Sequence, residues 1–187
     1  MPLSGAAWVT QFPGSTKITD LVNPFRSNLQ KFLTALKNAG VTPIISATFR
    51  PPERAYLMHH AFRIADPGDL LDPAKVQPMA GVDIQWVHRD GAGNPDIPTS
   101  RAKAKEMVKA YGIAFRPSLT SRHTEGNAID MTLTWTTPIT IVDGTGASIV
   151  IPGPGKGATN KLLHSVGASY QVLKLVVDPP HWSNDGR

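Results

Sequence analysis

The sequence contains no cysteine among its 187 residues. This absence excludes disulfide bonds, thiol nucleophiles and cysteine-ligated zinc. No apolar run reaches the roughly 18 residues that a membrane-spanning helix needs, so we expect no stable insertion into a membrane. Residues 1–5 lack the basic and apolar regions of a secretory signal peptide, and we expect a protein made in the cytoplasm without one.

Several patterns of common enzymes and binding proteins are also missing. There is no Gly-x-Ser-x-Gly elbow of a serine hydrolase, and the glycines of residues 153–157 lack the spacing of a phosphate-binding loop. The net charge is +5, but the basic residues form no dense tract with interleaved aromatics, so we expect no nucleic-acid partner. A modestly basic surface is compatible with an anionic partner such as the bacterial wall, and equally with a plain solvated surface.

The composition that is present indicates a folded globular protein. Hydrophobic residues make up 41% of the chain and charged residues 18%, which is far from the composition of a disordered chain. The length suits one domain. We therefore expect a monomer with a single domain over residues 1–187, an N-terminal arm at 1–22, and an inserted β-hairpin and Gly/Pro loop at 136–158.

Hydrophobic periodicity and end signals predict helices and strands without a regular alternation. Helices are predicted at 24–38, 51–65, 100–111 and 159–170. Strands are predicted at 43–48, 82–87, 128–135 and 173–177, and a hairpin pairs 139–142 with 148–151. This mixture predicts an α+β fold with a central antiparallel sheet flanked by helices.

Three residues of types that bind metals occur in two short segments. His123 and Asp130 lie within residues 121–130, and His181 lies near residue 187. Two imidazoles and one carboxylate are a usual ligand set for catalytic zinc, in which water takes the fourth position. Gly126 indicates a sharp turn, and the alternation after it predicts a strand on which Asp130 points away from the apolar face. On these residues alone, a capping aspartate and two unrelated histidines remain an open alternative.

The two segments also form an ordered pair of motifs. Residues 121–130 match Ser-x-His-x-x-Gly-x-Ala-x-Asp, and an acidic-x-x-His motif follows at Asp178 and His181. This pair resembles the zinc D-alanyl-D-alanine carboxypeptidases and L-alanyl-D-glutamate endopeptidases. That family includes vancomycin-resistance dipeptidases and phage endolysins and is structurally related to the zinc domain of hedgehog proteins. The resemblance runs from about residue 46 to residue 182 and implies an α+β fold with the site in a cleft on the sheet.

The resemblance implies a role for each site residue. His123, Asp130 and His181 would bind Zn²⁺. Asp178 would be the general base, although the family usually has glutamate there and aspartate is one methylene shorter. Glu125, inside the first motif, is the alternative base.

Other residues carry two readings each. Arg50 resembles the family's upstream arginine and would bind the developing oxyanion or a substrate carboxylate; the alternative is a surface salt bridge. Ser121 would hydrogen-bond substrate or hold the turn. Trp86 and Trp182 would line the cleft or belong to the core.

The expected function is therefore a zinc metallopeptidase that hydrolyses the stem peptides of bacterial peptidoglycan, of D-Ala-D-Ala carboxypeptidase or L-Ala-D-Glu endopeptidase type. Without a signal peptide it would be an endolysin or an antibacterial effector, and would act in the periplasm or cell wall after lysis or dedicated secretion. The alternative is a non-catalytic, zinc-stabilised binding module of hedgehog-like fold.

Overall fold

The computed structural model describes all 187 residues, which form two compact units. The first unit comprises residues 1–13 and 51–121, and the second comprises 14–50 and 122–187. The segment expected as an N-terminal arm is divided between them. The single domain expected from the sequence stays a prediction. None of the helices combines the length and the apolar character needed to cross a membrane.

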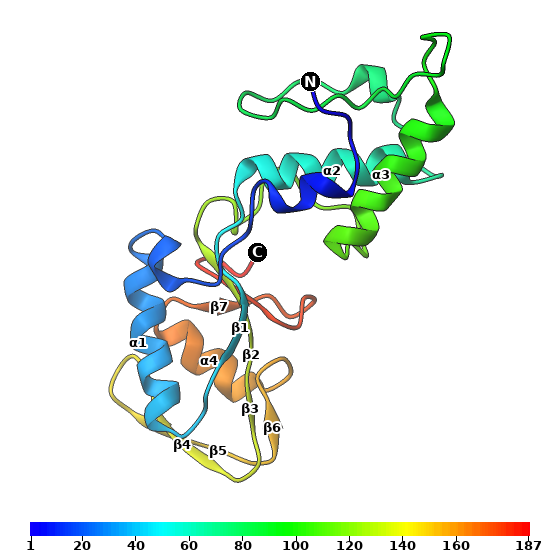
Figure 1. Cartoon of the computed structure of the whole chain (residues 1–187). Coiled ribbons are helices and arrows are strands. Elements are labelled where there is room, and N and C mark those ends of the chain that lie inside the picture. Colours follow the sequence, from blue (N-terminus) through cyan, green and yellow to red (C-terminus); the bar gives the residue numbers. More distant parts are fainter. The chain divides into compact units, whose positions relative to one another are not determined.

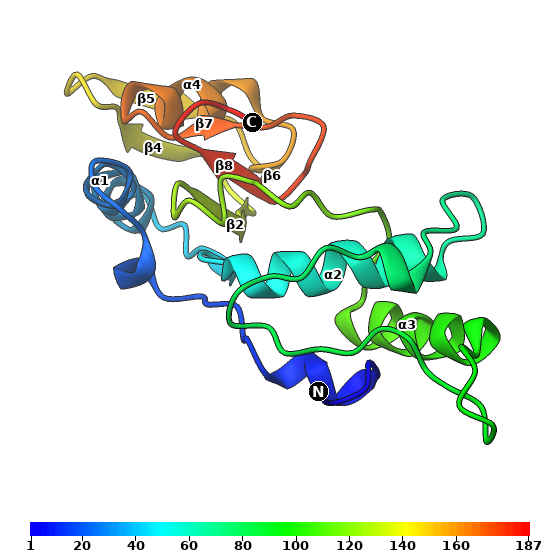
Figure 2. The same cartoon turned by 90° about the horizontal axis from the view of Figure 1, so that it is seen from above.

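The first unit is built on two helices, α2 (Pro52–Ala65) and α3 (Ile97–Tyr111), which pack side by side (Figure 2). Two short 3₁₀ helices, η1 (Ala6–Thr10) and η3 (Pro73–Lys75), belong to the same unit. Its core consists of apolar side chains from the two helices and from the segments around them: Trp8, Tyr56, Leu57, Ala61, Ile64, Val82, Ile84, Trp86, Ala104 and Met107.

Two predictions for the first unit are wrong in detail. Helix α3 begins at Ile97 instead of Ser100, because the Asp96 side chain accepts a hydrogen bond from the amide of Thr99 and caps the helix earlier. The segment 82–87 is not a strand and makes only isolated bridges. Its alternating pattern does reflect burial, but no neighbouring strand pairs with it along its length.

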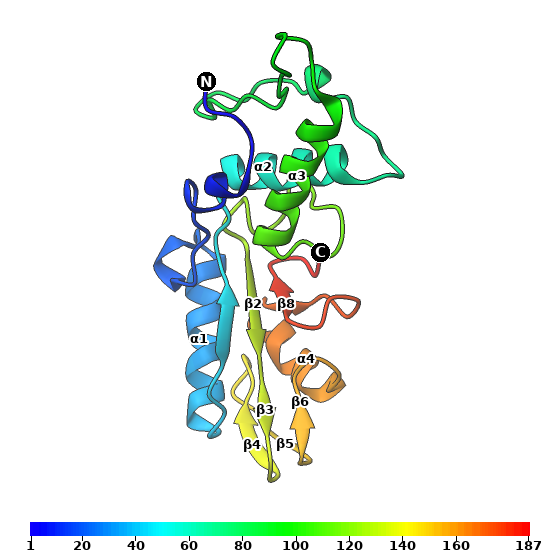
Figure 3. The same ribbon diagram turned by 45° about the vertical axis from the view of Figure 1, so that its right-hand side comes forward.

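The second unit contains the antiparallel sheet. Its four strands are β1 (Ile44–Ala47), β2 (Ala128–Thr132), β7 (Leu173–Lys174) and β8 (His181–Ser183), in the order β1-β2-β8-β7. Every pair is antiparallel, which confirms the predicted α+β class. Helices α1 (Phe25–Asn38) and α4 (Lys161–Ser169) lie beside this sheet (Figures 1 and 3), and η2 (Ile18–Asp20) precedes α1.

The core of the second unit lies on one face of the sheet. Ile129 of β2 is paired with Trp182 of β8, and both are fully buried. The Trp182 ring contacts Phe32 of α1 and His164 of α4, with ring centroids 5.5 and 5.7 Å apart. Because side chains alternate along a strand, the neighbouring pair Asp130 and His181 occupies the opposite face.

Two predicted strands of this unit are shorter than expected. The strand predicted at 128–135 is interrupted at Leu133, whose carbonyl accepts a hydrogen bond from the amide of Gly157. β3 (Thr134–Trp135) therefore pairs with a new partner, β6 (Gly155–Lys156). The strand predicted at 173–177 ends at Lys174, and a turn leads into β8, which was not predicted.

The hairpin of β4 (Ile139–Val142) and β5 (Ser148–Ile151) is confirmed. Helix α4 begins at Lys161, two residues later than predicted, because the Asn160 side chain accepts a hydrogen bond from the amide of Leu163 and caps it there.

Gly167 of α4 allows the close packing of this core. A Cβ atom at this position would lie 2.7 Å from Cζ3 of Trp182 and 2.8 Å from the carbonyl oxygen of Val172. We expect Gly167→Ala to lower the free energy of unfolding by about 1–3 kcal/mol through overpacking, although alanine favours a helix over glycine by about 1 kcal/mol. Ser165→Ala, at an exposed position of the same helix, is the control and should change the free energy of unfolding by less than about 0.5 kcal/mol. Urea unfolding measures both, and a Gly167→Ala protein as stable as the control would contradict this packing.

Candidate metal centre

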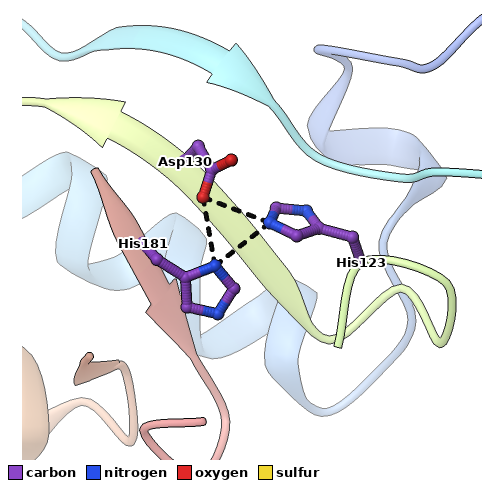
Figure 4. A group of neighbouring side chains, drawn as sticks. All are labelled: His123, Asp130 and His181. Atoms are coloured by element: carbon purple, nitrogen blue, oxygen red, sulfur yellow. Dashed lines mark hydrogen bonds and ion pairs between the residues drawn. The ribbon is translucent and has the colours of Figure 1, made fainter. Parts of the chain in front are cut away.

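Three side chains of the second unit converge on one point (Figure 4). The Nε2 atom of His123 lies 3.1 Å from Oδ1 of Asp130 and 3.1 Å from Nδ1 of His181. The remaining separation, from Nδ1 of His181 to Oδ1 of Asp130, is also 3.1 Å. The structure thus brings together the three residues that the sequence suggested as ligands.

The sheet positions two of these residues. Asp130 of β2 and His181 of β8 are directly paired across the antiparallel ladder, so their side chains are neighbours on the same face. That face is opposite to the one that carries Ile129 and Trp182 into the core. The strand pairing therefore supplies a carboxylate and an imidazole without any special loop.

His123 reaches the same point from the turn before β2. Its carbonyl accepts hydrogen bonds from the amides of Arg50 and Gly126, at 3.1 and 3.3 Å. Gly126 has a φ of +71°, and an added Cβ atom would lie 3.2 Å from Cγ1 of Val22. The left-handed conformation and the close neighbour both favour glycine there, as the sequence suggested.

A backbone carbonyl selects the tautomer of His123. The Nδ1 atom lies 2.6 Å from the carbonyl oxygen of Thr48. Because a carbonyl oxygen only accepts, Nδ1 must carry the proton, and the neutral ring directs the lone pair of Nε2 toward Asp130 and His181. Thr48 is fully buried. Its amide donates a hydrogen bond to the carbonyl of Ser15, and its hydroxyl donates one to the carbonyl of Lys17, so its position is fixed.

The His181 ring is oriented in the same way by a different segment. Its Nε2 atom lies 3.1 Å from the main-chain oxygen of Arg187, which can only accept a hydrogen bond. The proton therefore belongs on Nε2, and the lone pair of Nδ1 faces the centre. Outer hydrogen bonds of this kind commonly fix metal-binding histidines.

The resulting donor set fits a metal cation. Two imidazole lone pairs and one carboxylate oxygen face one another, and none of these three atoms can donate to the others while both rings are neutral. A cation among them removes this repulsion. Ligand atoms of tetrahedral zinc lie about 3.3 Å apart when each is about 2.0–2.1 Å from the ion, close to the separations of 3.1 Å found here.

Burial and the neighbouring imidazoles shift the pKa of Asp130 in opposite directions. Burial raises the pKa of Asp130, but hydrogen bonds from His123 and His181, and the positive charge that these rings carry when protonated, hold it well below its usual range. A metal cation in place of those protons would act in the same direction. Asp130 is therefore ionised, which is the form that binds metals. Its side chain is 19% exposed, against 5% and 7% for the His123 and His181 side chains, so solvent reaches the centre beside the carboxylate.

The two carboxylates suggested as general base lie differently. Asp178 is exposed in the turn between β7 and β8 and is not part of the three-residue cluster. Glu125 is also exposed, and its Oε2 atom is 2.5 Å from Nη1 of Arg122. This ion pair already engages one oxygen of the Glu125 carboxylate.

Of the remaining predicted residues, Arg50 follows β1 in the second unit. Its backbone amide donates a hydrogen bond to the carbonyl of His123, which places Arg50 next to the metal motif. Ser121 belongs to the first unit. The substrate-binding roles of both residues stay predictions. Trp86 and Trp182 are 4% and 1% exposed and belong to the cores of the first and second unit, so the alternative that they line a cleft is wrong.

Lys174 is a residue near the centre that sequence reasoning missed. Its ammonium group donates hydrogen bonds to the carbonyls of Leu175, Asp178 and His181 and so holds the turn from β7 to β8. Burial lowers its pKa, and the negative charges of Asp178 and Asp130 oppose that shift. The available signal was a single lysine in the otherwise apolar segment 172–177.

The donor set predicts one divalent metal ion for each chain, and zinc is the probe that suits these ligands. Asp130→Asn removes the anionic ligand and should weaken zinc binding by more than about a hundredfold, beyond the usual effect of changing an outer partner. His59→Ala, which changes a histidine of the first unit, should bind zinc like the wild type. Competition with a chelating dye measures the affinities.

If the His59→Ala protein failed to bind zinc, or if Asp130→Asn bound zinc as tightly as the wild type, the metal would bind at another site.

Comparisons with known proteins do not identify a family for this chain. No protein-family model matches the chain, and no curated protein matches it. The site is therefore interpreted from its own donor atoms and from the motifs of the sequence.

Proposed function

We propose that this chain is a zinc-dependent peptidase that hydrolyses peptidoglycan stem peptides, of the D-Ala-D-Ala carboxypeptidase or L-Ala-D-Glu endopeptidase type. The observation that carries the proposal is the convergence of three lone-pair atoms at 3.1 Å from one another, with the outer nitrogen of each imidazole hydrogen-bonded to a backbone carbonyl. The substrate class rests on the resemblance of the two motifs to the wall peptidases.

The number of ligands favours catalysis over a purely structural ion. Structural zinc sites have four protein ligands, whereas catalytic sites have three and leave one position open. This cluster has three members and is exposed on the side of Asp130. A zinc ion held there would supply a Lewis acid that polarises a substrate carbonyl and makes water acidic near neutral pH.

The chain's own residues would supply proton transfer and substrate binding. In the proposed mechanism the Asp178 carboxylate accepts a proton from the attacking water and returns it to the leaving nitrogen. Its exposed position leaves the carboxylate accessible to substrate. The Arg50 guanidinium binds the developing oxyanion or a substrate carboxylate, for which its planar set of donors is suited. Ser121 hydrogen-bonds the substrate or holds the turn.

The expected setting is the bacterial wall. A net charge of +5 favours association with an anionic polymer. The protein would act there as an endolysin or an antibacterial effector that reaches the periplasm or wall after lysis or dedicated secretion.

One observation favours a second candidate, a non-catalytic zinc-stabilised binding module. Asp178 lies outside the three-residue cluster, and Glu125 is paired with Arg122. A centre without a free carboxylate at its open side would bind zinc but lack a base. The base is therefore the residue that separates the two candidates.

Substitution of Asp178 tests the peptidase directly. Wild-type protein loaded with zinc should release stem-peptide fragments from purified peptidoglycan, and mass spectrometry of the fragments identifies the bond that is cut. Asp178→Ala should lower this rate by about 10²–10⁴-fold, the usual contribution of a general base, and should leave zinc affinity unchanged. Asp178→Glu, which has the same chemistry and one more methylene, should retain most of the activity.

Glu125→Gln is the matched control and should be fully active. Zinc binding by a wild-type protein that releases no fragments would favour the binding module. Equal activity of wild type and Asp178→Ala would show that Asp178 is not the base.

A further inference from the structure

An ion pair joins the two segments that carry the histidine ligands. The guanidinium of Arg122 donates from Nε to both oxygens of Asp185, at 3.1 Å each, and from Nη2 to Oδ2 at 2.5 Å. Arg122 directly precedes His123, and Asp185 lies four residues after His181. The backbone adds a link between the same segments, because Asn184 donates to the carbonyl of Asn127 at 3.1 Å.

Asp185 also shapes segment 184–187. Its Oδ1 atom accepts a hydrogen bond from the amide of Arg187 at 3.2 Å. The hydroxyl oxygen of Ser183, a fully buried residue, accepts from the amides of Gly186 and Arg187 at 2.9 and 3.1 Å. These bonds fold the segment back, so that the carbonyl of Arg187 lies 3.1 Å from Nε2 of His181.

We propose that the ion pair of Arg122 and Asp185 is a positioning device of the metal centre. It holds segment 184–187 in the conformation in which the main-chain oxygen of Arg187 keeps the proton of His181 on Nε2, and so leaves Nδ1 free to bind the ion. It also fixes the segment that begins with Arg122 and presents His123. This inference rests on the metal binding in the proposed function and is independent of peptide hydrolysis.

The environment of the pair supports a local role. The side chains of Arg122 and Asp185 are 28% and 26% exposed, and hydrogen bonds from Arg122 lower the pKa of Asp185 to about 2. Partly exposed pairs usually contribute little to global stability. An effect on the metal centre should therefore be larger than an effect on folding, and the two can be measured separately.

Zinc affinity tests the inference. Asp185→Asn and Arg122→Gln should each weaken zinc binding by about 10–100-fold, the usual cost of removing an outer partner. The double variant should bind zinc about as tightly as the single variant with the lower affinity, because both changes remove the same interaction. Asp185→Glu, which keeps the charge, should recover part of the affinity.

Two controls change neighbouring groups and leave the pair intact. Glu125→Gln removes the other partner of Arg122. Arg187→Ala removes an exposed side chain that also contacts Asp185 but keeps the backbone carbonyl. Both should bind zinc within about threefold of the wild type, far from the change expected for an outer partner. Thermal unfolding of each metal-free protein shows that every variant folds.

The tautomer of His181 gives a second measurement that a merely structural role would not change. In ¹⁵N NMR spectra of the metal-free protein with neutral imidazoles, the wild type should carry the His181 proton on Nε2, and Asp185→Asn should show a mixture of both tautomers. Unchanged zinc affinity and an unchanged tautomer in Asp185→Asn would overturn the inference. A wild-type chain that binds no zinc would overturn both proposals. Weakened binding in the variants, together with no peptidoglycan hydrolysis by the wild type, would support this inference and refute the peptidase.

Discussion

The pairing register of β2 with β8 is the constraint on which the rest of the second unit depends. In this register Asp130 faces His181 on one side of the sheet, while Ile129 faces Trp182 on the other. A slip of one residue would exchange the two faces and bury the carboxylate against α1 and α4. The hydrophobic core and the candidate metal centre are thus specified by the same hydrogen bonds. Because the core holds Trp182 between Phe32 and His164, burial of one large ring also secures the position of the adjacent ligand.

Orientation of the rings is a separate problem, and the chain solves it with main-chain oxygen atoms. The carbonyl oxygen of Thr48 accepts a hydrogen bond from Nδ1 of His123, and the main-chain oxygen of Arg187 accepts one from Nε2 of His181. Neither main-chain oxygen belongs to the turn or strand that carries its histidine. One comes from the end of β1 and the other from segment 184–187, so the centre requires the correct folding of segments that are distant in sequence. A carbonyl cannot change its role as an acceptor, which makes it a more definite selector of the tautomer than a hydroxyl or a water molecule.

The features that were predictable from the sequence are those encoded locally. Helix periodicity, the hairpin at 139–151 and the alternation around Asp130 each depend on neighbouring residues, and the structure confirms the fold class they imply. Apart from the convergence of His181 with His123 and Asp130, which the ordered pair of motifs suggested, features that depend on distant partners were not predictable. The segment 82–87 alternates but has no partner strand, whereas β8 has one and was missed. Arg122 and Asp185 meet only because the chain folds, since neither residue lies in a pattern that marks an ion pair.

The turn between β7 and β8 links the candidate metal centre to the proposed base, Asp178. Lys174 binds the carbonyls of Asp178 and His181, and the carbonyl of Pro180 accepts a hydrogen bond from Met131 of β2. The backbone that presents Asp178 is therefore tied to the backbone that presents the ligand. An aspartate is one methylene shorter than the glutamate of the wall peptidases, and its reach can be restored only by backbone placement. Two consecutive prolines restrict the backbone between Asp178 and His181, so placement of the carboxylate follows from placement of the ligand. In this chain the position of Asp178, the proposed base, is a property of the turn, and Lys174 is the side chain that fixes that turn.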